Sequence, residues 1–185
     1  MTVLVLETSR LYLRKIQVDD YNDICTILQD IDVMYAWGHA FSDIEVTEWI
    51  NENIMRYSRD GYSYWAVIEK ISDKLIGVTG LIAEKVDNED HVGVGYIYDK
   101  AYWKKGYAFE GAAACVDYAF NTLHINEITA QIRPENESSR KVAEKLGMSI
   151  KKDFIRRYKG EDIPHLLYAC NSLVQARLPE KTVAE

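Results

Sequence analysis

The chain of 185 residues contains no apolar run approaching the roughly 20 residues that a membrane-spanning helix needs. A short apolar run lies at Met1 to Leu6, but no basic stretch precedes it and no small-residue cleavage site follows it. We therefore expect no signal peptide, no membrane partner and a cytoplasmic location. The chain also lacks internal repeats, low-complexity tracts and linker-like segments, so its length predicts one domain with a proper core.

Metal-binding and disulfide patterns are missing as well. Cys25, Cys115 and Cys170 are single, widely spaced and odd in number, which excludes a disulfide framework and a cysteine zinc site. We expect them to be buried structural thiols. The four histidines are scattered and no H-E-x-x-H motif occurs, so no metal centre is predicted. Neither the P-loop pattern nor the dinucleotide-binding pattern G-x-G-x-x-G is present.

The chain has no excess of positive charge. Its net charge is −7 and its pI is near 5.2, whereas a general nucleic-acid binder is expected to carry a basic face. We therefore expect no nucleic-acid partner, while cationic substrates remain compatible with the charge. A content of 48% hydrophobic and 28% charged residues is close to that of an ordinary globular protein.

What is present is a mixture of strand and helix periodicities. Alternating apolar residues predict a strand, and apolar residues at helical spacing predict a helix. Ser42 with Glu45 matches a capping box at the start of a helix, and Gly61 marks its end. The order is β-α-α-β-β-β-α-β-α-β-β, an α+β fold with a mixed, mostly antiparallel sheet of about seven strands and four helices. The strands are expected within 9–16, 64–70, 75–83, 91–98, 125–133, 148–156 and 162–170.

The stretch WKKGYAFEG, residues 103–111, stands at the start of an alanine-rich helix expected over 106–121. The first turn of a helix offers unpaired N–H groups and the positive end of the helix dipole, which together bind anions such as phosphate. Gly106 and Ala108 leave room for an anion, and Lys104 and Lys105 add positive charge. From spacing alone, a pyrophosphate cradle and a solvated basic turn are equally good interpretations.

A second informative stretch is PENESSRKVAEKLGM, residues 134–148. Ser139 heads an apolar stripe with Val142, Ala143 and Leu146, so its hydroxyl is expected to face inward and to need a partner, either a backbone group or a ligand. Asn136 is a candidate N-cap of this helix.

In this order, the two stretches resemble the GNAT superfamily of acetyl-CoA-dependent N-acetyltransferases. The resemblance runs from LETSRLYLRKI (6–16) to HLLYAC (165–170) and is strongest to the Rim-type branch, which includes ribosomal-protein N-terminal acetyltransferases. That branch has W-G-K-G-Y-A-x-E-A at the cofactor site, where this chain has WKKGYAFEG. It also favours N-x-x-S before E-K-L-G-F, matched here by Asn136, Ser139 and EKLGM.

The chain departs from the family pattern at several positions. Lys104 replaces the first glycine of W-G-K-G, so its side chain must point away from the phosphates or contact them. The tyrosine that many members use as general acid is Ala143 here, and the serine of N-x-x-S, Ser139, is the proposed substitute. The acidic residue that some members carry on the central strand is replaced by Gly93.

The resemblance implies a GNAT-like domain over residues 1–170, a C-terminal tail over 171–185, and a sheet splayed between strands 91–98 and 125–133. It implies acetyl-CoA as co-substrate, Ser139 as catalytic acid, and an oxyanion-binding N–H near Ile97. Tyr35, Trp37 and His39 are expected to line the acceptor site, although core packing explains Tyr35 and Trp37 equally well. The residues expected to bind the cofactor are Tyr96, Ile97, Tyr98, Trp103, Lys104, Lys105, Gly106, Tyr107, Ala108, Asn136 and Ser139.

Several points stay open at this level. No convincing general base is visible, and Glu84 and His91 are expected to be surface residues more often than bases. The acceptor is a protein N-terminus or a small-molecule amine, and a homodimer is a family expectation only. The alternatives are a catalytically inactive CoA-binding sensor and an α+β interaction domain with no ligand.

Overall fold

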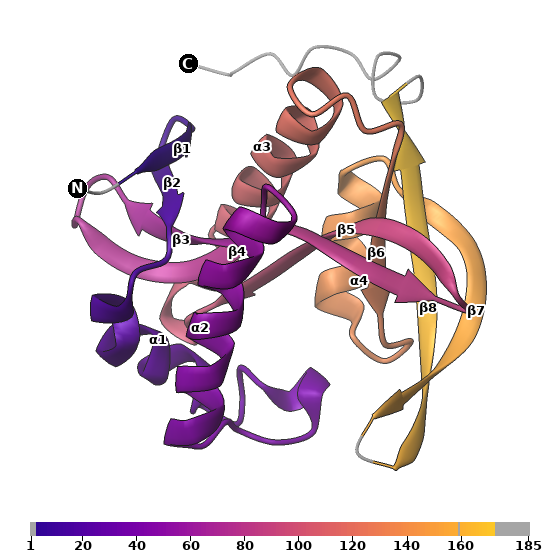
Figure 1. Cartoon of the computed structure of the whole chain (residues 1–185), viewed down its shortest axis with the longest axis horizontal. Helices are drawn as coiled ribbons and strands as arrows, with labels where there is room; N and C mark the ends of the chain where they lie inside the picture. The colour runs from indigo at the N-terminus through magenta and orange to yellow at the C-terminus, as the bar shows by residue number, and fades with distance from the viewer. Residues whose placement is uncertain (1–2, 159, 173–185) are drawn as a thin grey trace.

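The computed structural model describes residues 3–158 and 160–172. These form one eight-stranded sheet in the order β1-β2-β3-β4-β5-β6-β8-β7, with four α-helices and three short 3-10 helices (Figure 1). The strands are β1 Leu4–Glu7, β2 Leu11–Lys15, β3 Tyr64–Glu69, β4 Lys74–Val86, β5 Glu89–Tyr98, β6 Glu127–Ile132, β7 Ser149–Tyr158 and β8 Glu161–Asn171. The helices are η1 Val18–Asp20, α1 Tyr21–Leu28, η2 Tyr35–Trp37, α2 Asp43–Arg59, η3 Lys100–Tyr102, α3 Tyr107–Asn121 and α4 Glu137–Lys145.

The α+β class and the mixed, mostly antiparallel sheet are confirmed, with one strand more than the seven expected. The extra strand is β1, a four-residue edge strand that pairs antiparallel with β2. So short a segment shows too little alternation to be recognised in the sequence. The helical spacing of Ile24, Ile27, Leu28 and Ile31 predicts a helix that reaches residue 31, but α1 ends at Leu28 and Ile31 is 56% exposed.

Helices cover both faces of the sheet (Figure 1). Alternate residues of β3 belong to two different apolar clusters, as the two-residue period of a strand requires. Trp65 and Val67 pack with α3 and α4, whereas Ala66 and Ile68 pack with α1 and α2. The sheet is therefore the middle of three layers, and its side chains reach two separate cores.

Local signals fix the ends of two helices that border the site. The Ser42 hydroxyl accepts from the Glu45 N–H, and the Glu45 carboxylate accepts from the Ser42 N–H, which confirms the predicted capping box of α2. Asn136 is the N-cap of α4, as predicted, since its side chain accepts from the Ser139 N–H.

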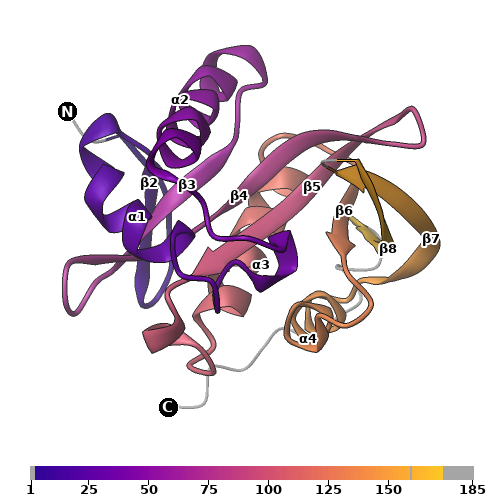
Figure 2. The same cartoon turned by 90° about the horizontal axis from the view of Figure 1, so that it is seen from below.

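The sheet opens between β5 and β6. These two strands are parallel neighbours but pair at a single position, Gly93 with Thr129. Beyond it β6 continues with β8 while β5 continues with β4, so the residues from Val94 to Tyr98 have no partner on the β6 side. Figure 2 shows α4 beside the end of β6 and the β7–β8 pair on the far side of this opening. We call the opening the wedge.

The last strand, β8, ends at Asn171, one residue beyond the strand expected over 162–170. The rest of the predicted tail, from residue 173 onward, lies outside the described residues. Within the described residues, no helix has the length and apolar character required to cross a membrane.

Candidate active site

The loop before α3 forms one side of the site. The Trp103 indole Nε1–H donates to the Tyr98 carbonyl at 2.8 Å and fixes the loop to the end of β5. Lys104 and Gly106 both have positive φ, +61° and +84°, the left-handed region that favours glycine. This conformation explains why the related motif W-G-K-G has a glycine at the position of Lys104. The lysine adopts the same turn at a cost of about 1 kcal/mol.

The loop and the first turn of α3 present backbone donors to solvent. Gly106 is the N-cap of α3 but has no side chain to cap it, and the loop residues 103–106 are exposed. Within the described part of the chain, the N–H groups of Gly106, Tyr107 and Ala108 donate to no carbonyl oxygen. We call this group of donors the cradle, since it has the open geometry that an anion requires.

A hydrogen-bond network holds the cradle in place from behind. One oxygen of Glu110 accepts from the Thr8 hydroxyl at 2.6 Å, the Ser9 hydroxyl at 3.1 Å and the Arg10 N–H at 2.9 Å. The Arg10 guanidinium binds the other oxygen at 2.6 Å and also donates to the Lys105 carbonyl at 3.0 Å. Burial alone raises the pKa of the Glu110 carboxyl, but these hydrogen bonds outweigh it and leave the pKa below its ordinary value. Glu110 therefore connects the Thr8–Arg10 turn to α3.

The side chains of the cradle are partly occupied. The buried Tyr107 hydroxyl donates to Glu69, so this residue offers a ligand only its backbone. The Lys105 ammonium lies over the Tyr102 ring, 5.0 Å from its centroid, and Lys104 is exposed. Trp103, 41% exposed, keeps its indole face accessible.

The N-terminus of α4 forms the other side of the wedge. Asn136 Oδ1 accepts from the Ser139 N–H at 3.1 Å and from the Tyr35 hydroxyl at 2.6 Å. The Tyr96 hydroxyl crosses the wedge and donates to the Ser139 carbonyl at 2.9 Å. Ser139 is half-buried, and its own hydroxyl has no partner among residues 3–158 and 160–172. The structure thus brings together four of the predicted residues.

Ile97 and Tyr98 point to opposite faces of β5, so they cannot both contact a ligand through their side chains. Ile97 is buried in the core beneath α1 and α2, and Tyr98 is buried against α3. The Tyr98 hydroxyl lies where a side chain at Gly111 would be, 2.5 Å from an added Cβ, which explains the small residue there. Only the backbone of these two residues is available to a ligand.

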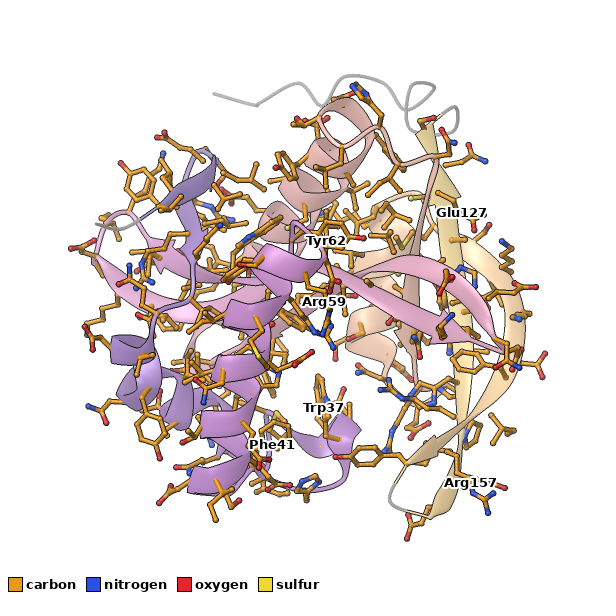
Figure 3. The ribbon with its side chains drawn as sticks, in the orientation of Figure 1. Trp37, Phe41, Arg59, Tyr62, Glu127 and Arg157 are labelled. Atoms are coloured by element: carbon orange, nitrogen blue, oxygen red, sulfur yellow. The ribbon has the colours of Figure 1, made fainter. Side chains whose placement is uncertain are left out.

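The loop between α1 and α2 borders the wedge on the α2 face. Figure 3 shows Trp37 rising from η2 into the space between α2 and the β7–β8 pair, with Arg157 near the turn of that pair. Tyr35 is 44% exposed. His39 Nε2 lies 3.0 Å from a Glu45 oxygen, and its ring stacks at 6.3 Å on Tyr158. His39 is thus held by neighbouring side chains, as Tyr35 is by Asn136.

Glu84 of β4 and His91 of β5 lie on this same face of the sheet. The expectation that Glu84 and His91 are surface residues is wrong: Glu84 lies in a cleft and the His91 side chain is 7% exposed. The cleft, of about 440 Å³, is formed by β4, β6, β7 and Arg56 of α2. A glycine on the neighbouring strand, Gly93, makes room for the Glu84 carboxyl, since an added Cβ there would be 2.4 Å from Oε1.

A similar arrangement occurs two residues further along β5, at Gly95, where the approaching side chain is that of Tyr64 on β3. Its hydroxyl lies over Gly95, 2.1 Å from an added Cβ, and it donates to no acceptor within the described residues. Gly93 and Gly95 therefore make room for polar side chains of the protein itself, from β4 and from β3 beyond it.

A second depression, of about 480 Å³, lies between α1 and Lys100 and is more open. Lys100 is already paired there with Asp30 at 2.7 Å and Asp32 at 3.0 Å, so its ammonium group is not available to a ligand. No cluster of three or more histidine, cysteine or acidic side chains in the described ranges is placed to hold a metal ion. All three cysteines are free; Cys115 and Cys170 are buried and Cys25 is half-buried.

The wedge, the cradle and the sheet order can be compared with known proteins. Residues 10–149 match the acetyltransferase (GNAT) domain family. The chain belongs to the GNAT acetyltransferase family. It is 31% identical over 157 residues to the uncharacterized N-acetyltransferase p20 of Bacillus licheniformis, covering 83% of this chain and 86% of that protein.

Solved structures of GNAT proteins share the fold. An acetyltransferase of the GNAT family from Bacillus anthracis superposes with a TM-score of 0.76 at 26% identity, covering 92% of this chain and 98% of that one. RimL, a ribosomal L7/L12 α-N-protein acetyltransferase solved with coenzyme A, superposes with a TM-score of 0.76 at 17% identity. That alignment covers 94% of this chain and 99% of RimL, and at such identity it shows the fold alone.

Proposed function

We propose that this GNAT protein transfers the acetyl group of acetyl-CoA to a primary amine, by direct attack of the amine on the thioester in a ternary complex. The observation that carries the proposal is the cradle, with three backbone donors that have no partner among the described residues, at the mouth of a wedge in the sheet. A cradle of this kind suits the pyrophosphate of coenzyme A, because the helix dipole and the two lysines favour negative charge.

The residues around the wedge fit such a co-substrate. Gly106, Tyr107 and Ala108 would bind the pyrophosphate through their N–H groups, with Trp103, Lys104 and Lys105 beside it. The pantetheine arm would pair with the backbone of Tyr96 and Ile97, because the Tyr98 carbonyl is already bound by Trp103. Asn136 and Ser139 would face it from α4. When bound, acetyl-CoA supplies an activated acetyl thioester.

The chain's own groups then support acyl transfer. A β5 N–H near Ile97 would stabilise the oxyanion that forms on the thioester carbonyl. Ser139 would give a proton to the departing thiolate, and its hydroxyl is free of competing partners in the described residues. Because the Tyr96 hydroxyl binds the Ser139 carbonyl, the serine is already held at the wedge before any ligand arrives.

For the acceptor we propose a protein N-terminus or a small-molecule amine, bound beside Tyr35, Trp37 and His39. We also propose that the protein belongs to the Rim-type branch. Support for the branch comes from WKKGYAFEG and from Asn136 and Ser139, and the likeness to RimL adds only the fold. A domain over 1–170, a cytoplasmic location and a homodimer are proposals that rest on the sequence and the family.

A catalytically inactive CoA-binding sensor is the second candidate. Two observations favour it: Lys104 occupies a left-handed position where relatives have glycine, and Ala143 stands where many relatives have the tyrosine acid. In this alternative the cradle still binds CoA, but the residues around the wedge no longer catalyse acyl transfer.

One experiment separates these possibilities. Thermal unfolding is measured with and without acetyl-CoA, and a panel of amines and N-terminal peptides is then assayed through release of the CoA thiol. A ligand at 100 times its dissociation constant stabilises the fold by about 2.7 kcal/mol, which is readily detected. A shift with turnover supports the transferase, a shift without turnover on any acceptor supports the sensor, and no shift contradicts both.

A further inference from the structure

The carboxyl of Glu84 lies over the central strand β5, in space that is free because residue 93 is a glycine. Glu84 lies on β4 directly opposite His91 of β5, and its side chain leans along the strand toward Gly93. An added Cβ at Gly93 would be 2.4 Å from Oε1 and 2.8 Å from Cδ, so any other residue there would push the carboxyl away. The carboxyl therefore occupies the space that a side chain at position 93 would fill.

This position is the apex of the wedge. Gly93 is the only residue of β5 that pairs with β6, and its partner is Thr129. The Thr129 hydroxyl lies 3.4 Å from Glu84 Oε1 and 3.3 Å from the Val92 carbonyl. The carboxyl thus stands where the two strands begin to separate, on the face that carries Trp37 and the acceptor-side loop.

The surroundings of Glu84 leave it without a positively charged partner. No lysine or arginine forms an ion pair with it among the described residues, although the cleft also holds Arg56 and Arg156. Burial is the largest influence and raises the pKa of the Glu84 carboxyl above its ordinary value. Hydrogen bonds from Gln131 and Thr129 and the charges of Arg156 and His91 oppose this without cancelling it. On the same face Tyr64, whose hydroxyl has no acceptor within the described residues, lies over Gly95.

We propose that Glu84 is the general base that removes a proton from the incoming ammonium group. The inference rests on the proposed function and supplies the base that the motif residues lack. A carboxylate with a raised pKa and an open position suits this role, because a base works best when its pKa approaches the working pH. The Tyr64 hydroxyl is placed to hold a water or the amine beside it.

The protons and bonds balance as follows. Glu84 takes one proton from the ammonium, and the neutral amine nitrogen attacks the thioester carbonyl. The C–N bond forms, the C–S bond breaks, and the nitrogen's extra proton passes to the CoA thiolate, through Ser139 in our proposal. Glu84 finally releases its proton to solvent, so the products are the acetylated amine, CoA thiol and one proton.

The kinetic test compares three variants with the wild type on an amine that the wild type acetylates. Glu84→Gln keeps the size of the side chain but cannot accept the proton, so kcat is expected to fall about 100-fold while the KM for acetyl-CoA is unchanged. Gly93→Ala leaves Glu84 in the sequence and displaces its carboxyl, so it should reproduce most of the loss. Glu48→Gln, on an exposed position of α2, is the matched control and should behave as the wild type.

The pH dependence distinguishes a base from a structural carboxylate. In the wild type kcat/KM should rise with pH through the raised pKa of Glu84, and in Glu84→Gln that limb should be lost. Titration of the glutamate carboxyl by 13C NMR, without acetyl-CoA, gives a readout independent of activity. The signal absent from Glu84→Gln should titrate above an exposed glutamate in the wild type and return to the ordinary range in Gly93→Ala.

Turnover of Glu84→Gln within about threefold of the wild type, or an ordinary Glu84 titration, overturns the inference and leaves the proposed function standing. A wild type that acetylates no acceptor contradicts the proposed function instead. In that case the titration alone decides whether the Glu84 carboxyl has the raised basicity claimed here.

Discussion

Two half-buried glutamates, Glu110 behind the cradle and Glu84 in the cleft, have opposite environments. Glu110 accepts from Thr8, Ser9 and both the backbone and side chain of Arg10, and its pKa lies below the ordinary value. Glu84 has no ion-pair partner within the described residues, and burial leaves its pKa above the ordinary value.

The difference shows how similar carboxyl groups take different tasks in one fold. A carboxylate that receives several donors is strongly held in its ionised form and serves to connect segments of the chain. A carboxylate that is desolvated without a cation keeps a readily exchanged proton, which suits chemistry. The glutamate on the cradle side thus connects two segments of the chain, and the glutamate in the cleft is the one that we propose as the base.

The largest expected effect comes from breaking the cradle alone. In Gly106→Glu, an anionic side chain enters a left-handed position at the helix start and competes with the phosphates, so affinity for acetyl-CoA should fall at least 100-fold by calorimetry. Gly160→Glu is the matched control, because Gly160 has a similar φ of +86° and nothing within 4 Å of an added Cβ. Retained affinity in Gly106→Glu would show that the cradle is misplaced.

A second prediction compares the two glutamates as contributors to stability. Glu110→Ala leaves the hydroxyls of Thr8 and Ser9 and the Arg10 guanidinium without their acceptor, and should lower the free energy of unfolding by about 2 kcal/mol. Glu84→Gln should cost little or nothing, since it removes a charge that burial disfavours. Urea denaturation with unchanged m-values measures both. Equal losses in the two variants would contradict the comparison.

The next effect concerns the opposite wall of the wedge. Ser139→Ala should lower turnover about 10-fold, with a much smaller change in acetyl-CoA affinity, because the serine acts on the departing thiolate. Ser138→Ala, on the exposed neighbouring position, is the control. Unchanged turnover in Ser139→Ala would remove this residue from the mechanism.

The contributions of Glu110 and Glu84 to the free energy of unfolding should also depend on pH in opposite directions. Because the folded pKa of Glu110 is lowered, its stabilisation is present above the unfolded value near 4.5 and is lost as the pH falls through the folded pKa. Because the folded pKa of Glu84 is raised, its protonated form favours folding, and this contribution is lost as the pH rises above about 4.5 through the folded pKa. Unfolding curves of Glu110→Gln and Glu84→Gln, each compared with the wild type from pH 3 to pH 8, should diverge in opposite directions; a common direction would contradict the assignment.

The smallest effect is expected at Lys104. Lys104→Gly relieves the left-handed conformation, worth about 1 kcal/mol, but adds freedom to the unfolded chain, so the net gain in stability should be about 0.5 kcal/mol. If the ammonium group contacts phosphate, acetyl-CoA affinity falls in the same variant. Thermal unfolding and calorimetry on one sample therefore separate the backbone role of Lys104 from its charge.

The sequence predicted the cradle side of the site better than the cleft side. The glycine at 106 and the cap at Asn136 act through neighbouring backbone groups, so their roles follow from local patterns. The position of Glu84 depends on the register of β4 against β5 and on a glycine nine residues away. Neither can be recognised from the residues next to Glu84 in the sequence. The support from Arg10 to Glu110 was equally hidden, because it joins residues 100 positions apart.

This separation along the chain predicts that the support of the cradle forms late in folding. The Thr8–Arg10 turn and α3 can meet only after a loop of about a hundred residues has closed, which is a slow kind of contact to form. The cradle loop is therefore supported by a turn that is synthesised about a hundred residues before α3 and must wait for this helix to appear. Recovery of acetyl-CoA affinity during refolding would therefore report the docking of the Thr8–Arg10 turn against the cradle loop.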